Sequence, residues 1–387
     1  MSDVTIIARQ GAAAAENAAN SGESASATEL KRVLDICNAC RYCEGFCATF
    51  QTLSRRREVD WQELDYLANL CHGCTACYHA CQYAPPHVFS INAPLAFSEQ
   101  RIASYAQFSW PGFMGKLFQK NGLVMSVATA VVLFLTLLLG SLLVNRDTLL
   151  SQQVQPGAFY QVVSHEFLVA TAGTVFLFAI FSMAVSAARF GRASKTPQQK
   201  MTLRALGQAL RSAATMRYLG GGHGEGCNAE NESFSNQRRI FHQFTMWGFL
   251  LCFAATCTAT VYEYFLGRLS PFPFLSLPVL LGTVGGVGLL VGPAGLTWVK
   301  LRSDTRPVDT RQYGMDYGFL ALLFLVSLTG LALLALRETT AMGVLLLVHL
   351  GFVFSLFVTL PYSKFVHGVY RFVALVLFHG EETRTRQ

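Results

Sequence analysis

Two cysteine runs near the N-terminal end share the pattern C-x-x-C-x-x-C-x-x-x-C. The first run consists of Cys37, Cys40, Cys43 and Cys47, and the second of Cys71, Cys74, Cys77 and Cys81. Three closely spaced thiolates can hold three corners of an iron–sulfur cubane, and the remote fourth reaches the other cluster in two-cluster ferredoxins. The spacing therefore predicts two [4Fe–4S] clusters, one on Cys37, Cys40, Cys43 and Cys81 and the other on Cys71, Cys74, Cys77 and Cys47.

The alternatives for these cysteines are a zinc site or free thiols. Ala48 and Gln82 stand where a proline commonly follows the fourth cysteine, which changes the expected loop but leaves the ligand set intact. Zinc sites use four ligands per metal, often as paired C-x-x-C knuckles. Two tandem four-cysteine runs fit cubanes better. Cys227 lies in a separate glycine-rich stretch and has no assigned role at this point.

Four histidines lie in or beside long apolar segments, at His165, His242, His349 and His367. Ionisable residues at membrane depth are functional hypotheses by default, because an unsatisfied polar group is costly there. His349 and His367 are 18 residues apart, about five turns of 3.6 residues, which would place both on one helix face. The alternative for any single histidine is an interfacial anchor or a satisfied core residue.

The apolar segments position these histidines at two depths. Six stretches without Lys or Arg reach the ~20 residues that a membrane-spanning helix needs. They cover residues 122–144, 163–188, 241–266, 274–299, 317–336 and 341–360. Counting along these spans pairs His165 with His349 toward the outer face and His242 with His367 toward the cytoplasmic face. Two ligands at each level predict b-type haem, with one or two haems left open.

The loops between the spans differ in positive charge, which predicts orientation under the positive-inside rule. Residues 189–240 and 300–316 are rich in Lys and Arg, whereas the alternate connections hold only Arg146, Arg268 and Arg337. Both chain ends are therefore expected in the cytoplasm, with the protein in a bacterial inner membrane. The net charge of +7 follows from this asymmetry and needs no nucleic-acid partner.

The expected fold is mainly α, with an α-helical two-cluster ferredoxin-like domain followed by a six-helix transmembrane bundle. Small polar residues predict a disordered tail over 1–28. The cluster domain is expected at 29–110, the transmembrane haem b domain at 111–380, and a short tail at 381–387. The basic run Arg55–Arg57 is expected to be solvated.

Nothing in the sequence indicates bond-making chemistry on a metabolite. No Ser/His/Asp triad or phosphate loop is found, and the glycine-rich runs 220–226 and 281–288 do not follow a strand and open a helix, as a dinucleotide fingerprint must. In the second run, Gly282 and Gly286 predict close packing between two spans. Electrons are therefore the expected cargo.

Several stretches together resemble the citrate/tricarballylate-utilisation protein B family. They are CNACRYCEGFC, CHGCTACYHAC, RYLGGGHGEGCN, LLGTVGGVGLLVGPAGL and LPYSKFVHG, and the likeness spans roughly residues 33–380. The resemblance implies a membrane iron–sulfur and haem b protein that reoxidises a soluble FAD-dependent dehydrogenase of tricarballylate or a related acid and passes electrons to quinone. More remotely, the last span resembles the haem b (gamma-type) subunits of nitrate reductase, which carry paired ligands on one helix, as His349 and His367 would.

Two other functions remain open from the sequence. The same cofactors could serve a membrane redox sensor, although no kinase or DNA-binding output module stands out. A heterodisulfide-reductase-like subunit is a third possibility, but its additional CCG-like cysteine motifs are absent. An electron-transfer subunit of the flavoprotein:quinone type therefore remains the leading hypothesis, with membrane lipid as its surroundings.

Overall fold

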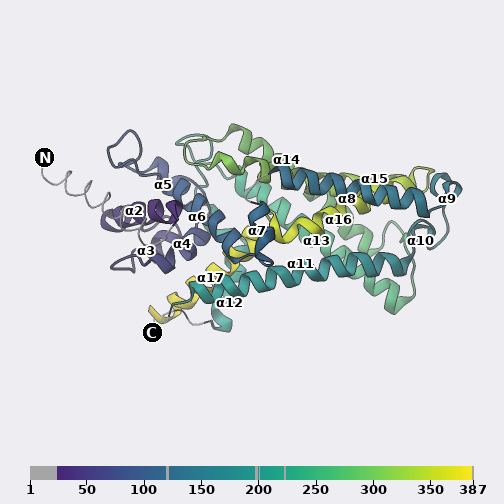
Figure 1. Ribbon diagram of the computed structural model, residues 1–387, viewed down its shortest axis with the longest axis horizontal. Helices are drawn as coiled ribbons and strands as arrows, with labels where there is room; N and C mark the ends of the chain where they lie inside the picture. Colours follow the sequence, from purple (N-terminus) through teal and green to yellow (C-terminus); the bar gives the residue numbers. More distant parts are fainter. Residues whose placement is uncertain (1–23, 119–121, 197–198, 200, 222–223, 386–387) are drawn as a thin grey trace, which may run out of the picture.

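The computed structural model describes residues 24–118, 122–196, 199, 201–221 and 224–385 of the chain. The molecule is elongated, with short helices gathered at one end and long helices running side by side to the other (Figure 1). We call the first part the head (residues 24–110) and the second part the bundle. Of the tail predicted over residues 1–28, residues 1–23 lie outside the described residues.

The head is built from short helices. They are α2 (Ala25–Cys40), α3 (Ala48–Leu53), η1 (Trp61–Glu63), α4 (Leu64–Leu70), α5 (Ala76–His79) and α6 (Ala93–Phe108). Helix α2 begins earlier than the expected domain boundary at residue 29, because the Ser24 side chain caps it by accepting a hydrogen bond from the Ala27 backbone N–H. Residues 25–28 thus belong to the head and not to a tail.

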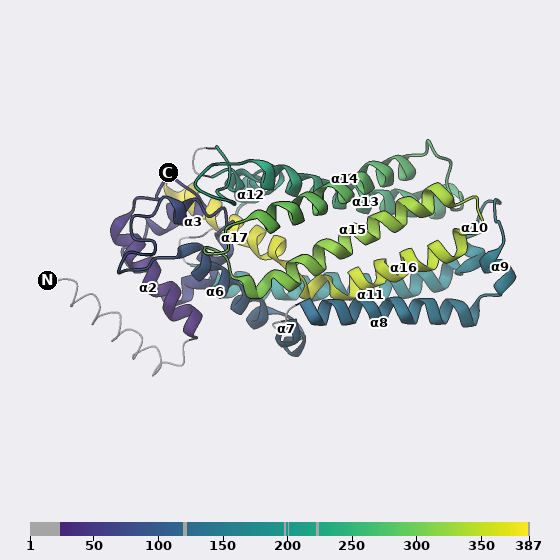
Figure 2. The same cartoon turned by 90° about the horizontal axis from the view of Figure 1, so that it is seen from above.

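Six long apolar helices form the bundle. They are α8 (Gly122–Leu143), α11 (His165–Ser194), α13 (Gln237–Leu266), α14 (Leu277–Arg302), α15 (Tyr313–Leu336) and α16 (Met342–Thr359). Each is long and apolar enough to cross a membrane. The prediction of six spans is confirmed, and the chain is a multi-pass membrane protein. Figure 2 shows the same bundle from above.

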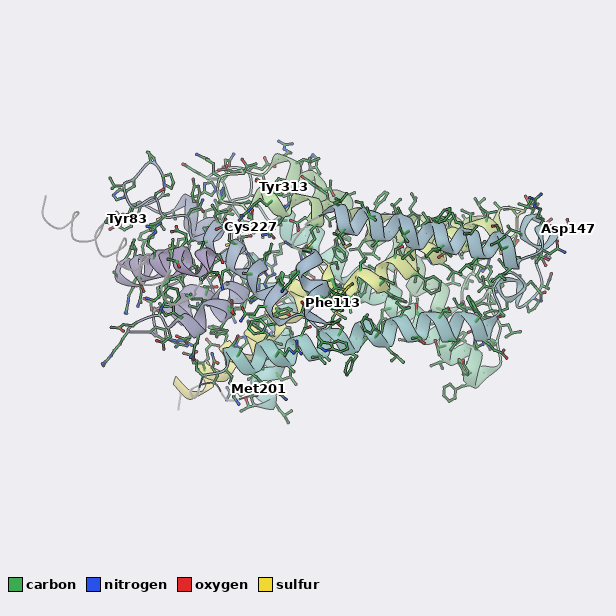
Figure 3. All side chains as sticks on the ribbon, viewed as in Figure 1. Tyr83, Phe113, Asp147, Met201, Cys227 and Tyr313 are labelled. Carbon is green, nitrogen blue, oxygen red and sulfur yellow. The ribbon has the colours of Figure 1, made fainter. Side chains whose placement is uncertain are left out.

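Shorter helices connect these elements. They are α7 (Gly112–Phe118), α9 (Arg146–Leu150), α10 (Ala158–Val162), α12 (Leu203–Ala214), η2 (Arg217–Leu219), η3 (Thr310–Gln312), η4 (Leu360–Tyr362) and α17 (Val366–Thr385). The described residues contain no strand, only one isolated bridge between Cys227 and Ser235. The mainly α prediction is therefore confirmed. Figure 3 shows Cys227 where the head meets the bundle and Asp147 at the far end.

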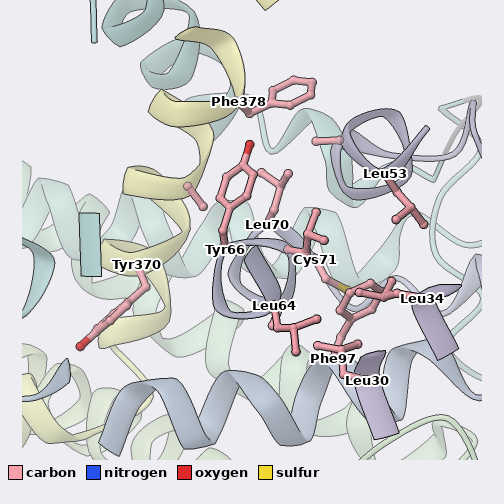
Figure 4. Packing of buried hydrophobic residues seen from close by; sticks show 14 of the residues in the cluster. Leu30, Leu34, Leu53, Leu64, Tyr66, Leu70, Cys71, Phe97, Tyr370 and Phe378 are labelled. Carbon is pink, nitrogen blue, oxygen red and sulfur yellow. The ribbon is translucent and has the colours of Figure 1, made fainter. Parts of the chain in front are cut away.

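The last helix, α17, packs into the core of the head. Its Tyr370 and Phe378 are buried in one cluster with Leu30, Tyr66 and Leu70 from the head (Figure 4). Residues 366–380 were expected to belong to the transmembrane domain, but their apolar side chains pack against the head helix α4 as well as against α11 and α12. The C-terminal helix thus ties the head to the end of the sixth span.

An ion pair network reinforces this connection. Arg56 forms ion pairs with Glu63 in the head, at 2.8 Å, and with Glu381 on α17. The Arg56 side chain is only 14% exposed, so the expectation of a solvated basic run is wrong at this position. The sequence did not indicate that Arg56 is buried, because its partner Glu381 lies 325 residues away along the chain and is brought close only by the tertiary fold.

Glycines set the distance between α13 and α14. A Cβ atom on Gly285 would lie 2.8 Å from the backbone nitrogen of Cys252 and the carbonyl oxygen of Gly248, so only hydrogen fits there. Of the predicted pair, Gly282 has only an ordinary contact, at 3.7 Å from Ala255, whereas Gly286 permits a close approach to α15, since a Cβ there would lie 3.0 Å from Leu331 Cγ. The close approach therefore uses the neighbouring face of the glycine run, and it fixes the position of α13.

Candidate functional site

The first cysteine set surrounds a cavity at the end of α2. Cys37 and Cys40 lie in the last turn of that helix, which ends at Arg41 in a left-handed conformation with φ 56°. Cys43 follows in the next turn, and Cys81 comes after α5. All four line one cavity of about 280 Å³, which Cys77 also touches. The structure thus brings Cys81 to the first run, although it is the last member of the second.

The second set lines a smaller cavity of about 10 Å³ on the side of the head that faces the bundle. Its cysteines are Cys47, Cys71, Cys74 and Cys77. Cys47 precedes α3, so it reaches across to the run that begins after α4. Both crossed groupings correspond to the sets expected from spacing. What these sets bind stays a prediction.

The thiols are in surroundings that disfavour free thiolates. Burial, together with neighbouring thiols, raises the pKa of Cys37 and of Cys43 to about 12 and that of Cys47 to about 11. These groups stay protonated near neutral pH unless a bound cation displaces the protons. Within the described residues, no three His, Cys, Asp or Glu side chains converge on a point that suits one metal ion. The first set therefore surrounds an open volume, whereas the second set is packed around a space no larger than about one water molecule.

Two of the four histidines face each other where the bundle meets the head. The rings of His242 on α13 and His367 on α17 lie with centroids 5.8 Å apart and planes at 76°. With metal–nitrogen bonds of about 2 Å on each side, two imidazoles on one metal atom lie at about this separation. His242 Nδ1 is buried and has no hydrogen-bond partner. This pair fits a bis-histidine haem site.

Hydrogen bonding orients the second member of this pair. Nδ1 of His367 donates to the Lys364 carbonyl oxygen, which leaves Nε2 with a free lone pair. Burial, followed by the nearby positive charge of Arg371, lowers the pKa of His367 well below its usual value. A neutral imidazole whose other nitrogen is fixed by a carbonyl is the form that ligates metals.

His349 lies deeper in the bundle and does not share a continuous helix with His367. Helix α16 ends at Thr359, η4 follows with Pro361, and Ser363 is extended before α17 begins. The expectation that regular helical turns align the two histidines is therefore wrong, because the chain is interrupted between them. His349 Nδ1 lies 3.1 Å from Thr329 Oγ1, whose own proton is directed to the Leu325 carbonyl oxygen at 2.7 Å. Its Nε2 is thereby left free.

His165 has partners other than those expected. Its Nε2 lies 3.5 Å from Glu263 Oε2, and the rings of Tyr160 and Tyr264 pack against it. Among the described residues, no hydrogen bond or ring contact joins it to His349. Tyr160 and Ser270 also donate to Glu263, so the carboxylate organises this end of the bundle. Glu263 could have been identified from the sequence as a candidate functional residue, because it is an acidic residue inside an apolar span.

Two arginines link the histidine pair to the second cysteine set. Arg371 on α17 donates to the Cys71 carbonyl oxygen at 2.9 Å, and Arg238 on α13 donates to the Gly73 carbonyl oxygen. Each arginine lies four residues from the histidine on its own helix, about 6 Å along the axis. The helices that present His242 and His367 therefore also hold the loop of the second cysteine run.

Comparisons with known proteins identify the family of this chain. A family model described as citrate utilization protein B matches residues 115–387, and one described as its Fer4-like domain matches residues 30–107. This chain belongs to the citrate utilization protein B family. The Escherichia coli citrate utilization protein B is 47% identical over 359 residues, which cover 93% of each chain. No solved structure matches.

In this member of the citrate utilization protein B family, the loop after η2 supports the second cysteine set. The Cys227 thiol is fully buried and donates to the Leu219 carbonyl oxygen at 3.0 Å, and it packs beside Cys74. The next residue, Asn228, donates its backbone N–H to the Cys74 carbonyl oxygen at 3.1 Å and accepts from the Thr75 hydroxyl. In this structure the Cys227 thiol therefore packs against the second cysteine run without lining its cavity.

Proposed function

We propose that this chain carries electrons from a soluble FAD-dependent dehydrogenase of tricarballylate or a related acid to quinone in the membrane. Two [4Fe–4S] clusters on the two cysteine sets and b-type haem on the histidines would form the route. Membership in the citrate utilization protein B family supports a role in citrate or tricarballylate utilisation, and the Fer4-like domain supports iron–sulfur clusters. The dehydrogenase and the quinone come from the family resemblance.

One observation carries this proposal: α13 and α17 hold both the second cysteine set and the histidine pair. Arg238 and Arg371 bind the carbonyls of Gly73 and Cys71, and His242 and His367 lie one helical turn away on the same helices. On each helix, one helical turn joins the arginine to the histidine, so α13 and α17 set the spacing between the two sites. Electron transfer between two bound redox groups requires such a fixed distance, whereas binding of iron alone does not.

The chain's own residues have separate roles in this scheme. Cubane clusters and haem iron, when bound, accept and release single electrons. The cysteine thiols give up their protons on cluster assembly, and the Cys227 loop keeps Cys74 in place. The Lys364 carbonyl holds His367 in the tautomer that leaves Nε2 available.

The surface around the first cysteine set is a suitable docking site for the electron donor. It lies in the larger cavity, whose lining includes Tyr42, and the Tyr42 side chain is 67% exposed. Val88, in the loop after Cys81, is 80% exposed. We infer that the soluble donor meets the head at this end, on the cytoplasmic side that the loop charges indicate.

Anaerobic purification followed by iron analysis, EPR and visible spectroscopy tests this proposal. We expect about eight cluster iron atoms per chain, in addition to haem iron, since two cubanes contain four each. Adding the reduced dehydrogenase should reduce both haem and clusters, and a quinone analogue should then reoxidise the haem. A matched control omits the dehydrogenase and adds quinone to dithionite-reduced protein.

The outcomes separate the candidates. Zinc in place of iron would contradict the whole scheme. Haem that stays reduced after quinone addition would contradict the quinone step and favour the sensor function instead.

A further inference from the structure

Three arginines converge on the backbone of the second cysteine run. Arg101 on α6 donates to the Cys71 carbonyl oxygen at 2.8 Å, and Arg371 on α17 donates to the same oxygen at 2.9 Å. Arg238 on α13 donates to the Gly73 carbonyl oxygen. Three different helices thus place positive charges around residues 71–73.

These charges have no anionic protein partner. Within the described residues, none of the three arginines forms an ion pair with a carboxylate, although Arg32 and Arg56 in the same head do. His72, between them in the loop, is buried as well. The site therefore has excess positive charge that a bound anion would stabilise.

The first cysteine set has a different arrangement. Within the described residues, its loop holds one arginine, Arg41, which donates to the Asn38 carbonyl oxygen at 3.0 Å and is exposed to solvent that screens its charge. The nearby Arg32 donates to the Phe89 carbonyl oxygen at 3.0 Å, but it is neutralised by Glu29 at 2.7 Å. Reduction of a cluster adds a negative charge, and nearby cations favour that charge; net charge and hydrogen bonds are known to set cluster potentials.

We propose that Arg101, Arg238 and Arg371 raise the reduction potential of the cluster on Cys47, Cys71, Cys74 and Cys77 above that of the other cluster. This inference rests on the proposed function, because it requires both clusters. Transfer of one electron from the outer cluster, which would be oxidised, to the inner cluster beside His242 and His367, which would be reduced, would then be favourable. The arginines act as positioning residues that give electron flow its direction toward the bundle.

A potentiometric titration followed by EPR tests the proposal on the full-length protein. We expect two separate one-electron transitions, with the higher potential assigned to the inner cluster. Arg371→Gln and, on a different helix, Arg101→Gln should each lower only that potential. We expect a shift of at least tenfold in the equilibrium between the clusters, which is about 59 mV for one electron.

Charge-conserving variants and a matched control complete the design. Arg371→Lys and Arg101→Lys should restore the higher potential, and Arg32→Gln should leave both potentials unchanged. The proposal is overturned if the Gln variants keep wild-type potentials, or if the Lys and Gln variants lose the inner cluster alike, because the arginines would then be structural clamps. Absence of cluster signals from the wild-type protein would instead contradict the proposed function itself.

Discussion

His242 and His367 face each other from α13 and α17, with ring centroids 5.8 Å apart, although 125 residues separate them in the sequence (367 − 242). His242 begins an apolar span, and His367 lies just beyond the interruption that ends another. The pair therefore sits where the bundle meets the head. This is the level at which electrons from a head cofactor would enter the membrane.

Replacing either histidine should remove the haem bound at this level. We expect His242→Ala and His367→Ala to lose the corresponding b-haem absorbance in the dithionite-reduced spectrum, because in the proposed site each would supply one of two histidine ligands. His165→Ala is the matched control, since His165 pairs with Glu263 instead. Full haem content in the His367 variant would show that the ligand assignment is wrong.

His349 decides the number of haems. Its free Nε2 leaves it available as a ligand deeper in the bundle, and Thr329 fixes its ring. If two haems are bound, His349→Ala should halve the haem content per chain, and the haem held by His242 and His367 should remain bound. Haem quantified per protein measures this directly, and an unchanged ratio would mean that His349 is a satisfied core residue.

The crossed cysteine sets can be tested by double substitution. Cys81→Ala should remove the cluster formed with Cys37, and Cys77→Ala should remove the other, each lowering cluster iron by about half. The Cys37→Ala/Cys81→Ala double variant should then lose no more iron than either single variant, because both belong to one cluster. The Cys77→Ala/Cys81→Ala double variant should lose both clusters. Equal iron contents in the two double variants would contradict the crossed assignment.

The Arg56 ion pairs should contribute strongly to the stability of the head. Arg56→Ala leaves Glu63 and Glu381 buried without their cation, and breaking a buried pair in this way costs about 3–5 kcal/mol. The neighbouring Arg57→Ala is the control, because that side chain is exposed. Thermal loss of cluster absorbance measures both variants. Similar midpoints for the two would show that the network is solvated and weak.

The sequence predicted the elements whose signal is local and missed those that depend on tertiary contacts. The six spans follow from apolar length, and the cysteine runs from spacing. The packing of α17 against the head could not be predicted, because Tyr370 and Phe378 look like ordinary apolar helix residues. The bonds of Arg238 to Gly73 and of Arg371 to Cys71 join positions 165 and 300 residues apart. The 18-residue histidine spacing failed as a helical argument because Pro361 lies in the turn that interrupts the helix.

Close packing of α13 on α14 should control the position of His242. In Gly285→Val, the new side chain would meet the backbone of Cys252 and Gly248, and such overpacking costs about 1–3 kcal/mol. Because Gly248 lies six residues from His242 on α13, we also expect the displaced helix to weaken haem binding. Gly173→Ala on α11 is the control, since a Cβ there meets no atom within 4 Å and helix propensity improves by about 1 kcal/mol. Thermal unfolding in detergent and haem retention measure both effects. A Gly285→Val protein as stable and haem-loaded as wild type would show that α13 can move away from α14 without cost.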